Sequence, residues 1–153
     1  MKPTLKQLIA EGKTLVSDGA WGTFLQAKGL KPGECPEMWN IEHPEAVLDI
    51  ARSYIEAGAD TIETNSFGGT CFKLEAFGLQ ERVYEINKRA AEISRQAAGP
   101  DKYVLGSVGP TGKILVMGDI TLHTECIKCV PILMMWNTAK CLLTTNLMWM
   151  PTN

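Results

Sequence analysis

An alternation of strand-like and helical segments along the first 120 residues constrains the fold more than any other feature of the chain. Strand-prone runs lie at 15–17, 59–64 and 103–108. Between them, residues 44–57 and 80–98 repeat apolar side chains at intervals of three and four positions, which is typical of one helix face. Parallel strands need a long crossover connection, and that connection is nearly always right-handed. The order strand, helix, strand, helix, strand therefore predicts the α/β class with parallel pairing.

Composition narrows the range of partners. The chain has 153 residues, of which 45% are apolar and 21% are charged, with a formal net charge of -2. These values are typical of one ordinary domain, and no cluster of Lys and Arg offers a surface for nucleic acid. The first residues lack the apolar run of a secretion signal, and no apolar stretch is long enough to cross a membrane. We therefore expect a cytoplasmic protein with a small-molecule ligand, and neither nucleic acid nor membrane as a partner.

Polar and glycine-rich segments follow each predicted strand, at 18–23, 65–70 and 109–112. Because the carboxyl ends of parallel strands carry the ligand site in α/β folds, we expect these segments on one rim. Glycines let backbone N–H groups approach a small anion, and a nearby carboxylate can hold an ammonium group. The pattern predicts a site for an amino-acid-sized zwitterion. Neither a phosphate-binding Walker sequence nor a dinucleotide-binding glycine motif follows any of the strands.

Four segments of the chain carry a resemblance to a known family, and they are Asp18–Thr23, Gly33–Asn40, Ala57–Gly68 and Gly106–Gly112. In their order, spacing and strand context, the chain from about residue 5 to residue 121 resembles the homocysteine S-methyltransferase family. The similarity is greatest to the homocysteine-binding module of cobalamin-dependent methionine synthases. The resemblance implies a (β/α)8 TIM barrel that binds homocysteine at its carboxyl rim.

The reaction that the resemblance implies is methyl transfer to the sulfur of homocysteine, which gives methionine. A thiol with a pKa of about 8.5 is mostly protonated at neutral pH, and coordination to zinc removes that proton and leaves the nucleophilic thiolate. The family therefore implies zinc as the metal, and methylcobalamin on a corrinoid partner protein or domain as the expected methyl donor. Families that use betaine or S-methylmethionine share the same opening sequence, so these donors remain alternatives.

The resemblance gives substrate-binding roles to the segment that follows the first predicted strand. Asp18 is expected to face the ammonium group of homocysteine. The backbone amides around Gly19, Ala20 and Gly22 are expected to face the substrate carboxylate, and Thr23 belongs to the same loop. These roles are implied by the family and do not follow from the spacing of the residues alone.

The segment that follows the second predicted strand adds Thr64 and Asn65 to the expected floor of the pocket. Glu63 is a weaker candidate, because its alternation with Ile62 along a barrel strand can equally point it into the polar layers of a barrel interior. We expect that structural role for Glu63. No residue of the chain is assigned a catalytic role.

The zinc ligands of the family are cysteines on late barrel strands, and no such motif occurs in this sequence. A whole barrel takes about 250 residues, so we expect an incomplete barrel of about the first three βα units that is catalytically incomplete. Cys126 and Cys129 are weak metal candidates, because a second well-spaced pair and turn glycines are missing around them. The alternative function is a non-catalytic small-molecule-binding or interaction fragment that associates with another chain to complete a barrel.

Residues 121–153 differ in composition from the rest of the chain. They contain no glycine, although the preceding 120 residues hold all 14, and they hold three of the five cysteines. Helical and strand periodicity is lost there. We therefore expect residues 1–120 to form the N-terminal part of a homocysteine-binding barrel domain, and residues 121–153 to form an irregular tail. A shifted reading frame or a truncated gene would produce such a tail, and translation of the other two frames tests this hypothesis.

Overall fold

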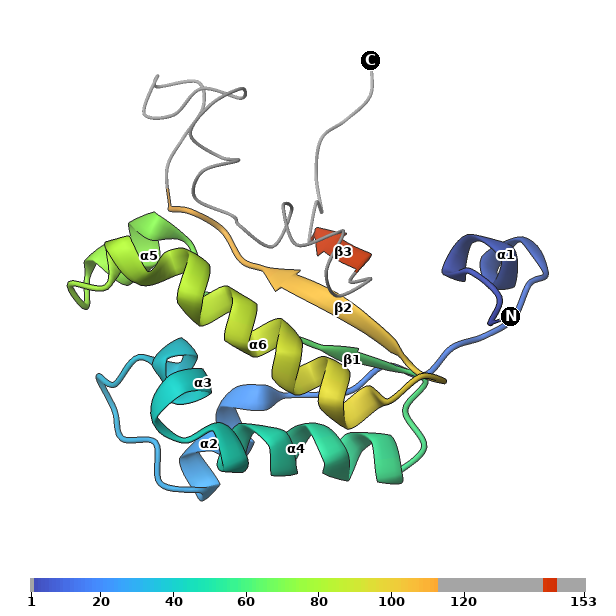
Figure 1. Cartoon of the computed structure of the whole chain (residues 1–153), viewed down its shortest axis with the longest axis horizontal. Coiled ribbons are helices and arrows are strands. Elements are labelled where there is room, and N and C mark those ends of the chain that lie inside the picture. The colour runs from blue at the N-terminus through green and yellow to red at the C-terminus, as the bar shows by residue number, and fades with distance from the viewer. Residues whose placement is uncertain (1, 113–141, 146–153) are drawn as a thin grey trace, which may run out of the picture.

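The computed structural model describes residues 2–112 and 142–145. A parallel three-stranded sheet lies at its centre, in the order β1 (Thr61–Glu63), β2 (Tyr103–Val108) and β3 (Leu142–Thr145). Two long helices, α4 (Pro44–Glu56) and α6 (Val83–Ala98), run along one face of β1 and β2 (Figure 1). The predicted α/β class with parallel pairing is confirmed.

Alternation along β1 and β2 separates an apolar face of the sheet from a polar one. Ile62 is paired with Val104 across the two strands, and both side chains pack against alanines of α4 and α6. Thr61 and Glu63 point to the opposite face, because successive side chains of a strand alternate. The helices therefore cover the apolar face, and polar side chains face away from them.

The first predicted strand, 15–17, is reduced to a single bridge between Ser17 and Thr61. Asp60 explains the difference, because its carboxylate accepts the Val16 N–H at 3.1 Å and withdraws that amide from a longer ladder. The same hydrogen bond is the main reason why the pKa of Asp60 is lowered. The pairing with β1 is therefore limited to one bridge, in which the Thr61 N–H donates to the Val16 carbonyl and the Asp18 N–H donates to the Thr61 carbonyl, each at 3.2 Å.

The two predicted helices are confirmed, with small changes at their ends. Helix α4 begins at Pro44, where a missing N–H costs nothing, and buries an apolar face against α6. The first residues of the predicted 80–98 segment form a separate 3₁₀ turn, η2 (Gln80–Arg82). Helix α6 ends at Ala98, and the φ of 59° at the next residue, Gly99, favours glycine. The predicted strand at 103–108 coincides with β2, and the one at 59–64 shortens to β1.

Several short elements lie beyond the carboxyl ends of β1 and β2, and they are α2 (Trp21–Ala27), η1 (Pro36–Met38), α3 (Trp39–Glu42) and α5 (Cys71–Glu75). Figure 1 shows α2, α3 and α5 at the end of the sheet toward which the strands point. Helices of this length hold too few turns to show an apolar period, so the sequence pattern does not predict them. They form the wall around the candidate site.

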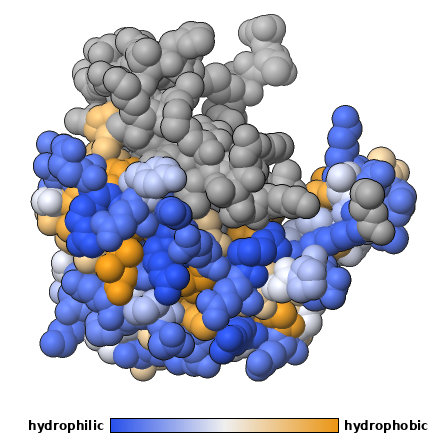
Figure 2. Space-filling model, in the orientation of Figure 1, coloured by the Kyte–Doolittle hydropathy of each residue, from blue (hydrophilic) through white to orange (hydrophobic). Residues whose placement is uncertain are grey.

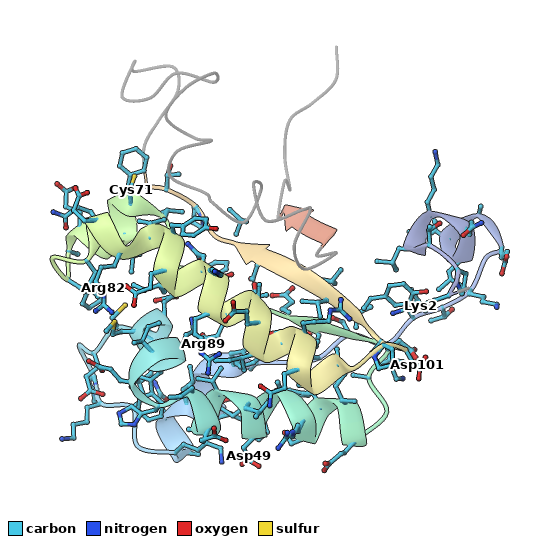
Figure 3. All side chains as sticks on the ribbon, viewed as in Figure 1. Lys2, Asp49, Cys71, Arg82, Arg89 and Asp101 are labelled. Carbon is cyan, nitrogen blue, oxygen red and sulfur yellow. The ribbon has the colours of Figure 1, made fainter. Side chains whose placement is uncertain are left out.

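The first described residues are fastened to the opposite end of the sheet. Helix α1 (Leu5–Ala10) begins with a capping box between Thr4 and Gln7. Before this helix, the Lys2 ammonium lies 3.6 Å from the centre of the Tyr103 ring, and the Tyr103 hydroxyl donates to the Pro3 carbonyl at 2.6 Å. Figure 3 shows Lys2 at the amino ends of the strands. This anchor is therefore remote from the carboxyl ends, where the candidate site lies.

Charged side chains occupy the outer faces of the helices. Arg82 pairs with Glu85 at 2.8 Å and Arg89 pairs with Glu92 at 3.4 Å (Figure 3). Exposed pairs of this kind contribute little to stability, because water and salt screen their charges. The face of the described chain seen in Figure 2 is mainly hydrophilic, with separate small hydrophobic areas. Among the described helices, none has the length and apolar character that a membrane crossing needs.

Strand β3 lies inside the segment that the sequence predicts to be irregular, so that prediction is wrong for residues 142–145. It pairs with β2 in parallel, with Leu142 opposite Leu105. The strand is too short to show an alternating pattern, but its threonines favour extended backbone and the edge of β2 offers unpaired main-chain groups. The weak metal candidates Cys126 and Cys129 lie outside the described residues, as does the expected boundary after residue 120.

Candidate functional site

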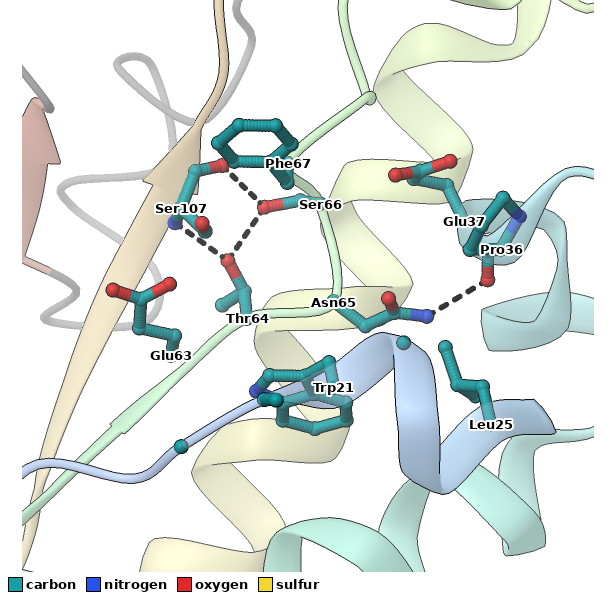
Figure 4. A pocket seen from close by; sticks show the side chains of 13 residues that line it. Trp21, Leu25, Pro36, Glu37, Glu63, Thr64, Asn65, Ser66, Phe67 and Ser107 are labelled. Atoms are coloured by element: carbon teal, nitrogen blue, oxygen red, sulfur yellow. Dashed lines mark hydrogen bonds between the residues drawn. The ribbon is translucent and has the colours of Figure 1, made fainter. Parts of the chain in front are cut away.

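A cavity of about 440 Å³ opens at the carboxyl ends of β1 and β2 (Figure 4). Its volume lies within the range of about 300–1,000 Å³ that is usual for small-molecule sites. The described residues that line it are Gly19, Ala20, Trp21, Gly22, Leu25, Pro36, Glu37, Glu63, Thr64, Asn65, Ser66, Phe67 and Ser107. This lining includes every predicted binding residue except Asp18 and Thr23.

Asp18 joins the two main segments of the cavity wall from behind the lining. Its Oδ2 accepts the indole N–H of Trp21 at 2.8 Å and the backbone N–H of Glu63 at 3.0 Å. Its Oδ1 accepts the Ser17 hydroxyl at 3.0 Å. Hydrogen bonds to a carboxylate are stronger than bonds between neutral groups. Because Trp21 begins α2 and Glu63 ends β1, this one carboxylate fixes the relative position of the two segments.

A close approach to α4 explains the small residues that follow Asp18. A Cβ on Gly19 would lie 3.2 Å from the Tyr54 hydroxyl oxygen, and that hydroxyl donates to the Ala20 carbonyl at 2.9 Å. Burial, and then the charge of Asp18, raise the pKa of Tyr54. Residues 21–23 form the first turn of α2, and not the expected loop, with no capping side chain from Ala20. The first-turn amides therefore lack a side-chain partner at the cap.

A closed ring of hydrogen bonds joins the segment after β1 to β2. The Ser107 N–H donates to Thr64 Oγ1 at 3.0 Å, and the Ser66 hydroxyl donates to the Ser107 carbonyl at 2.7 Å. The Ser66 proton is thereby used, so the 2.6 Å bond between the two hydroxyls has Thr64 as its donor. All three residues are buried. Figure 4 shows the ring at the edge of the cavity.

Asn65 is held by two hydrogen bonds with the Asn40 side chain, one to its main-chain carbonyl and one from its side-chain amide. The Asn40 amide donates to the Asn65 carbonyl at 2.8 Å, and the Asn65 amide donates to Asn40 Oδ1 at 3.1 Å and to the Pro36 carbonyl at 2.8 Å. Asn40 is fully buried. Buried polar groups need such partners, because an unpaired one costs about 1–3 kcal/mol. The pair therefore fixes the position of Asn65 against η1 and α3.

Glu37 is a buried carboxylate in the same wall, with an exposed fraction of 6%. Its Oε1 accepts the Gly68 N–H at 2.7 Å, and a Cβ on Gly68 would lie only 2.8 Å from that oxygen. Its Oε2 accepts the Cys35 thiol at 3.4 Å. Burial, and then the charge of Glu37, raise the pKa of Cys35 to about 11. Cys35 is therefore a protonated thiol at neutral pH.

The third predicted segment, 109–112, lies outside the described lining. The Gly109 N–H donates to the Phe67 carbonyl at 2.9 Å, and a Cβ on Gly109 would lie 2.5 Å from that oxygen. Gly109 therefore packs against Phe67 of the cavity wall, and Ser107 is the residue through which the end of β2 reaches the cavity. The three segments therefore lie at the carboxyl ends of the parallel strands as expected, but only the first two line the cavity.

Glu63 enters the cavity from the end of β1, and its side chain is half-buried. In the part of the chain that the structure describes, no group of three or more His, Cys, Asp or Glu side chains is arranged to hold a metal ion. These residues therefore do not fit the zinc that the family resemblance implies.

Sequence reasoning missed Glu37, Asn40, Ser66 and Ser107. Their partners are distant in sequence, with 31 positions between Glu37 and Gly68 and 25 between Asn40 and Asn65, so no local spacing indicates them. A weaker signal was present for the two serines, because each lies at or just after the end of a predicted strand. Glu37 and Asn40 lie in the Gly33–Asn40 segment, which is one of the four that carry the family resemblance.

The chain was compared with sequence families and curated relatives. The family model described as Homocysteine S-methyltransferase matches residues 15–129. The methionine synthase of Mycobacterium tuberculosis is 37% identical over an alignment of 125 residues, and the match covers 74% of this chain and 10% of that protein. The methionine synthase of Mycobacterium leprae is 36% identical over 125 residues, with the same coverage of 74% and 10%. The chain thus spans about a tenth of the length of these relatives.

Solved structures of the homocysteine methyltransferase MmuM from Escherichia coli resemble the fold. The oxidized form has a TM-score of 0.61 at 28% identity, and the match covers 81% of this chain and 48% of that enzyme. The metallated form has a TM-score of 0.66 at 25% identity, with coverage of 90% and 55%. The chain spans about half of MmuM. Because the family model matches residues 15–129, which are most of the chain, this chain belongs to the homocysteine S-methyltransferase family.

Proposed function

We propose that this chain forms the N-terminal part of a (β/α)8 barrel, and that its cavity binds the amino-acid end of homocysteine. The cavity itself carries the proposal, because the predicted binding segments at 19–22 and 64–65 meet in one space of about 440 Å³. That space lies at the carboxyl ends of parallel strands, where α/β folds place their ligands. Family membership supports the same ligand. Residues 1–120 are proposed to hold the first three βα units of this barrel.

The predicted residues other than Thr23 each have a proposed part in binding. The backbone amides around Gly19, Ala20 and Gly22 receive the substrate carboxylate, and Asp18 positions them through its bonds to the segments on either side. Thr64 and Asn65 form a rigid floor, because the Thr64 hydroxyl and the Asn65 side-chain N–H groups are committed to internal hydrogen bonds. A direct contact of Asp18 with the ammonium group stays a prediction, and so does any contact of the Thr23 side chain.

The proposed reaction of the whole barrel is methyl transfer to the homocysteine sulfur, with methionine as product. The curated relatives named methionine synthase support that product, and the metallated form of MmuM supports a metal. Zinc, when bound, would lower the pKa of the thiol, and methylcobalamin on a corrinoid protein or domain is the proposed methyl source. Because the described residues do not fit zinc, we assign them no step at the metal. Their part is to bind and orient the substrate.

Isothermal titration of the chain with L-homocysteine, under reducing conditions, tests the proposal. Gly22 lines the cavity, and a Cβ on it meets no atom within 4 Å, so Gly22→Leu can fold and places a side chain toward the ligand. We expect saturable binding to the wild-type chain and at least about tenfold weaker binding to Gly22→Leu.

The matched control is Gln26→Leu, which adds the same side chain to an exposed position of α2 outside the described lining. It is expected to bind homocysteine as the wild type does, and circular dichroism checks that both variants fold. Absence of saturable binding to the wild-type chain, or equal binding to Gly22→Leu, contradicts the proposal.

A further inference from the structure

The cavity contains more negative charge than its described lining neutralises. Two carboxylates, Glu37 and Glu63, lie in the wall, and no Lys, Arg or His is among the described lining residues. A carboxylate that is partly removed from water is stabilised by a nearby positive charge. The imbalance therefore favours a ligand that brings a cationic group.

The two carboxylates differ in what they can still bind. Glu37 is engaged on both oxygens, by the Gly68 N–H at 2.7 Å and the Cys35 thiol at 3.4 Å. Its exposed fraction of 6% leaves it little room to turn. Glu63 is half-buried, and within the described part of the chain its carboxylate makes no hydrogen bond and no ion pair. In Figure 4 the Glu63 side chain extends from β1 without a hydrogen bond to the other residues drawn.

The other polar side chains of the described lining are neutral, and most of their hydrogen-bonding groups are already committed. Thr64 and Ser66 use their hydroxyl protons inside the ring with Ser107. The Asn65 amide donates to Pro36 and Asn40. The Ser107 hydroxyl and Asn65 Oδ1 keep acceptor capacity but carry no charge, so Glu63 is the charged side chain of this described lining whose oxygens engage no described residue.

The backbone beneath Glu63 is held firmly. Its N–H donates to Asp18 at 3.0 Å, its carbonyl accepts the Ser94 hydroxyl at 3.1 Å, and its residue pairs with Leu105 of β2. A carboxylate on a fixed strand end can hold a donor in one place, because little of its backbone freedom remains to be lost on binding. A primary ammonium group offers three N–H donors, which suits this position.

We propose that Glu63 receives the ammonium group of the amino-acid ligand and so makes the site selective for amines over their deaminated analogues. This inference rests on the proposed function and deepens it. It changes the part of Glu63 from the purely structural role expected from the sequence to that of a specificity-determining residue. Glu37 is then a positioning residue, which holds the Gly68 end of the wall.

Three thiols that differ by one group test this assignment in titrations of the purified chain. L-homocysteine has both charged groups, 4-mercaptobutyrate lacks the amine, and 3-aminopropanethiol lacks the carboxylate. We expect the wild type to bind homocysteine at least about tenfold more tightly than 4-mercaptobutyrate, since a hydrogen bond to a charged group is worth that much. Glu63→Gln is expected to lose this preference.

Two further variants serve as controls. Glu56→Gln removes the same charge from the exposed last residue of α4 and is expected to keep the preference for homocysteine. Glu37→Gln is expected to weaken both ligands by similar factors and so also to keep it. A preference that survives in Glu63→Gln overturns the assignment, and one that disappears in Asp18→Asn instead transfers the role to Asp18.

The outcomes separate this inference from the proposed function. If homocysteine binds without any preference over 4-mercaptobutyrate, the proposed function stands and the role of Glu63 is refuted. If homocysteine does not bind but 3-aminopropanethiol does, and Glu63→Gln abolishes that binding, the ammonium site stands and the homocysteine function is refuted. Absence of binding by all three thiols refutes both.

Discussion

The helix side of the sheet and its carboxyl end are built by different physical means. On the helix side, Ile62 and Val104 pack against α4 and α6 with at most 1% of their surface exposed. At the carboxyl end, Thr64, Asn65 and Ser66 are also buried, but they are polar and engage in hydrogen bonds. Burial is therefore similar in the two regions, whereas the interactions that accompany it differ.

This difference indicates what each region does for the protein. Apolar burial has no preferred direction, so the helix side supplies stability and tolerates side chains of similar volume. Hydrogen bonds are directional, and a buried network holds its members in one arrangement. The carboxyl end therefore packs less adaptably than the helix side, but its hydrogen bonds hold the cavity in one shape. A selective ligand site requires such a fixed shape.

The largest expected effect comes from the helix side. Ile62→Ala removes a fully buried side chain between α4, α6 and β2, and it should lower the free energy of unfolding by about 2–5 kcal/mol. Ile9→Ala makes the same change at a position that is 69% exposed, and it should shift that free energy by less than about 0.5 kcal/mol. Urea denaturation followed by circular dichroism measures both. Similar losses in the two variants would contradict the assignment of the core.

The second largest effect is expected at the tight contact between Gly69 and Asn87. A Cβ on Gly69 would lie 2.2 Å from Asn87 Oδ1, and the buried Asn87 amide donates to the Gly69 carbonyl at 2.7 Å. Gly69→Ala should therefore lower the free energy of unfolding by about 1–3 kcal/mol through overpacking. At Gly22 a Cβ meets no atom within 4 Å, so Gly22→Ala should leave stability unchanged or raise it by up to about 1 kcal/mol. A tolerated Gly69→Ala would mean that the polar end repacks as freely as the helix side.

Titration offers a third contrast, because the buried thiol Cys35 lies at the polar end. Its pKa is about 11 in the folded chain, against an ordinary value of 9.0. Between these values the unfolded chain binds fewer protons than the folded chain, so a rise in pH favours unfolding. The contribution of this thiol to stability is thus complete below pH 9.0 and is lost as the pH approaches about 11. In urea denaturation from pH 8 to 11, the free energy of unfolding should fall more steeply with pH for the wild type than for Cys35→Ala. Equal slopes in the two proteins would contradict the raised pKa of Cys35.

Patterns within a single segment of the sequence predicted the main elements of the fold reliably. The apolar period of 44–57 and 80–98, and the strand-prone run at 103–108, correspond to α4, α6 and β2. The strand at 15–17 failed because one distant side chain, Asp60, takes a backbone N–H that the ladder needs. A pattern within one segment cannot show such competition between segments.

The residues of the candidate site likewise fall into those that the sequence could predict and those that it could not. Gly19, Gly22 and Asn65 follow predicted strands, so their presence in one cavity could be predicted from the order of the segments. Glu37 and Asn40 could not be, because their hydrogen bonds connect separate segments and depend on how η1 and α3 pack. The apolar side of this protein can therefore be predicted from the periodicity of apolar residues. The polar end depends on hydrogen bonds between residues that are distant in sequence.

The smallest expected effect concerns two threonines that share β1 and the segment after it. Thr61 is 4% exposed, and its hydroxyl oxygen has no hydrogen-bond partner among the residues that the structure describes. Thr61→Val removes an unsatisfied buried hydroxyl and should raise the free energy of unfolding by about 1 kcal/mol. Thr64→Val makes the identical change in a residue whose hydroxyl belongs to the ring with Ser66 and Ser107, so it should lower that free energy by a similar amount. Thermal denaturation of both variants compares the signs, and equal signs would show that the polar end is not stabilised by its network.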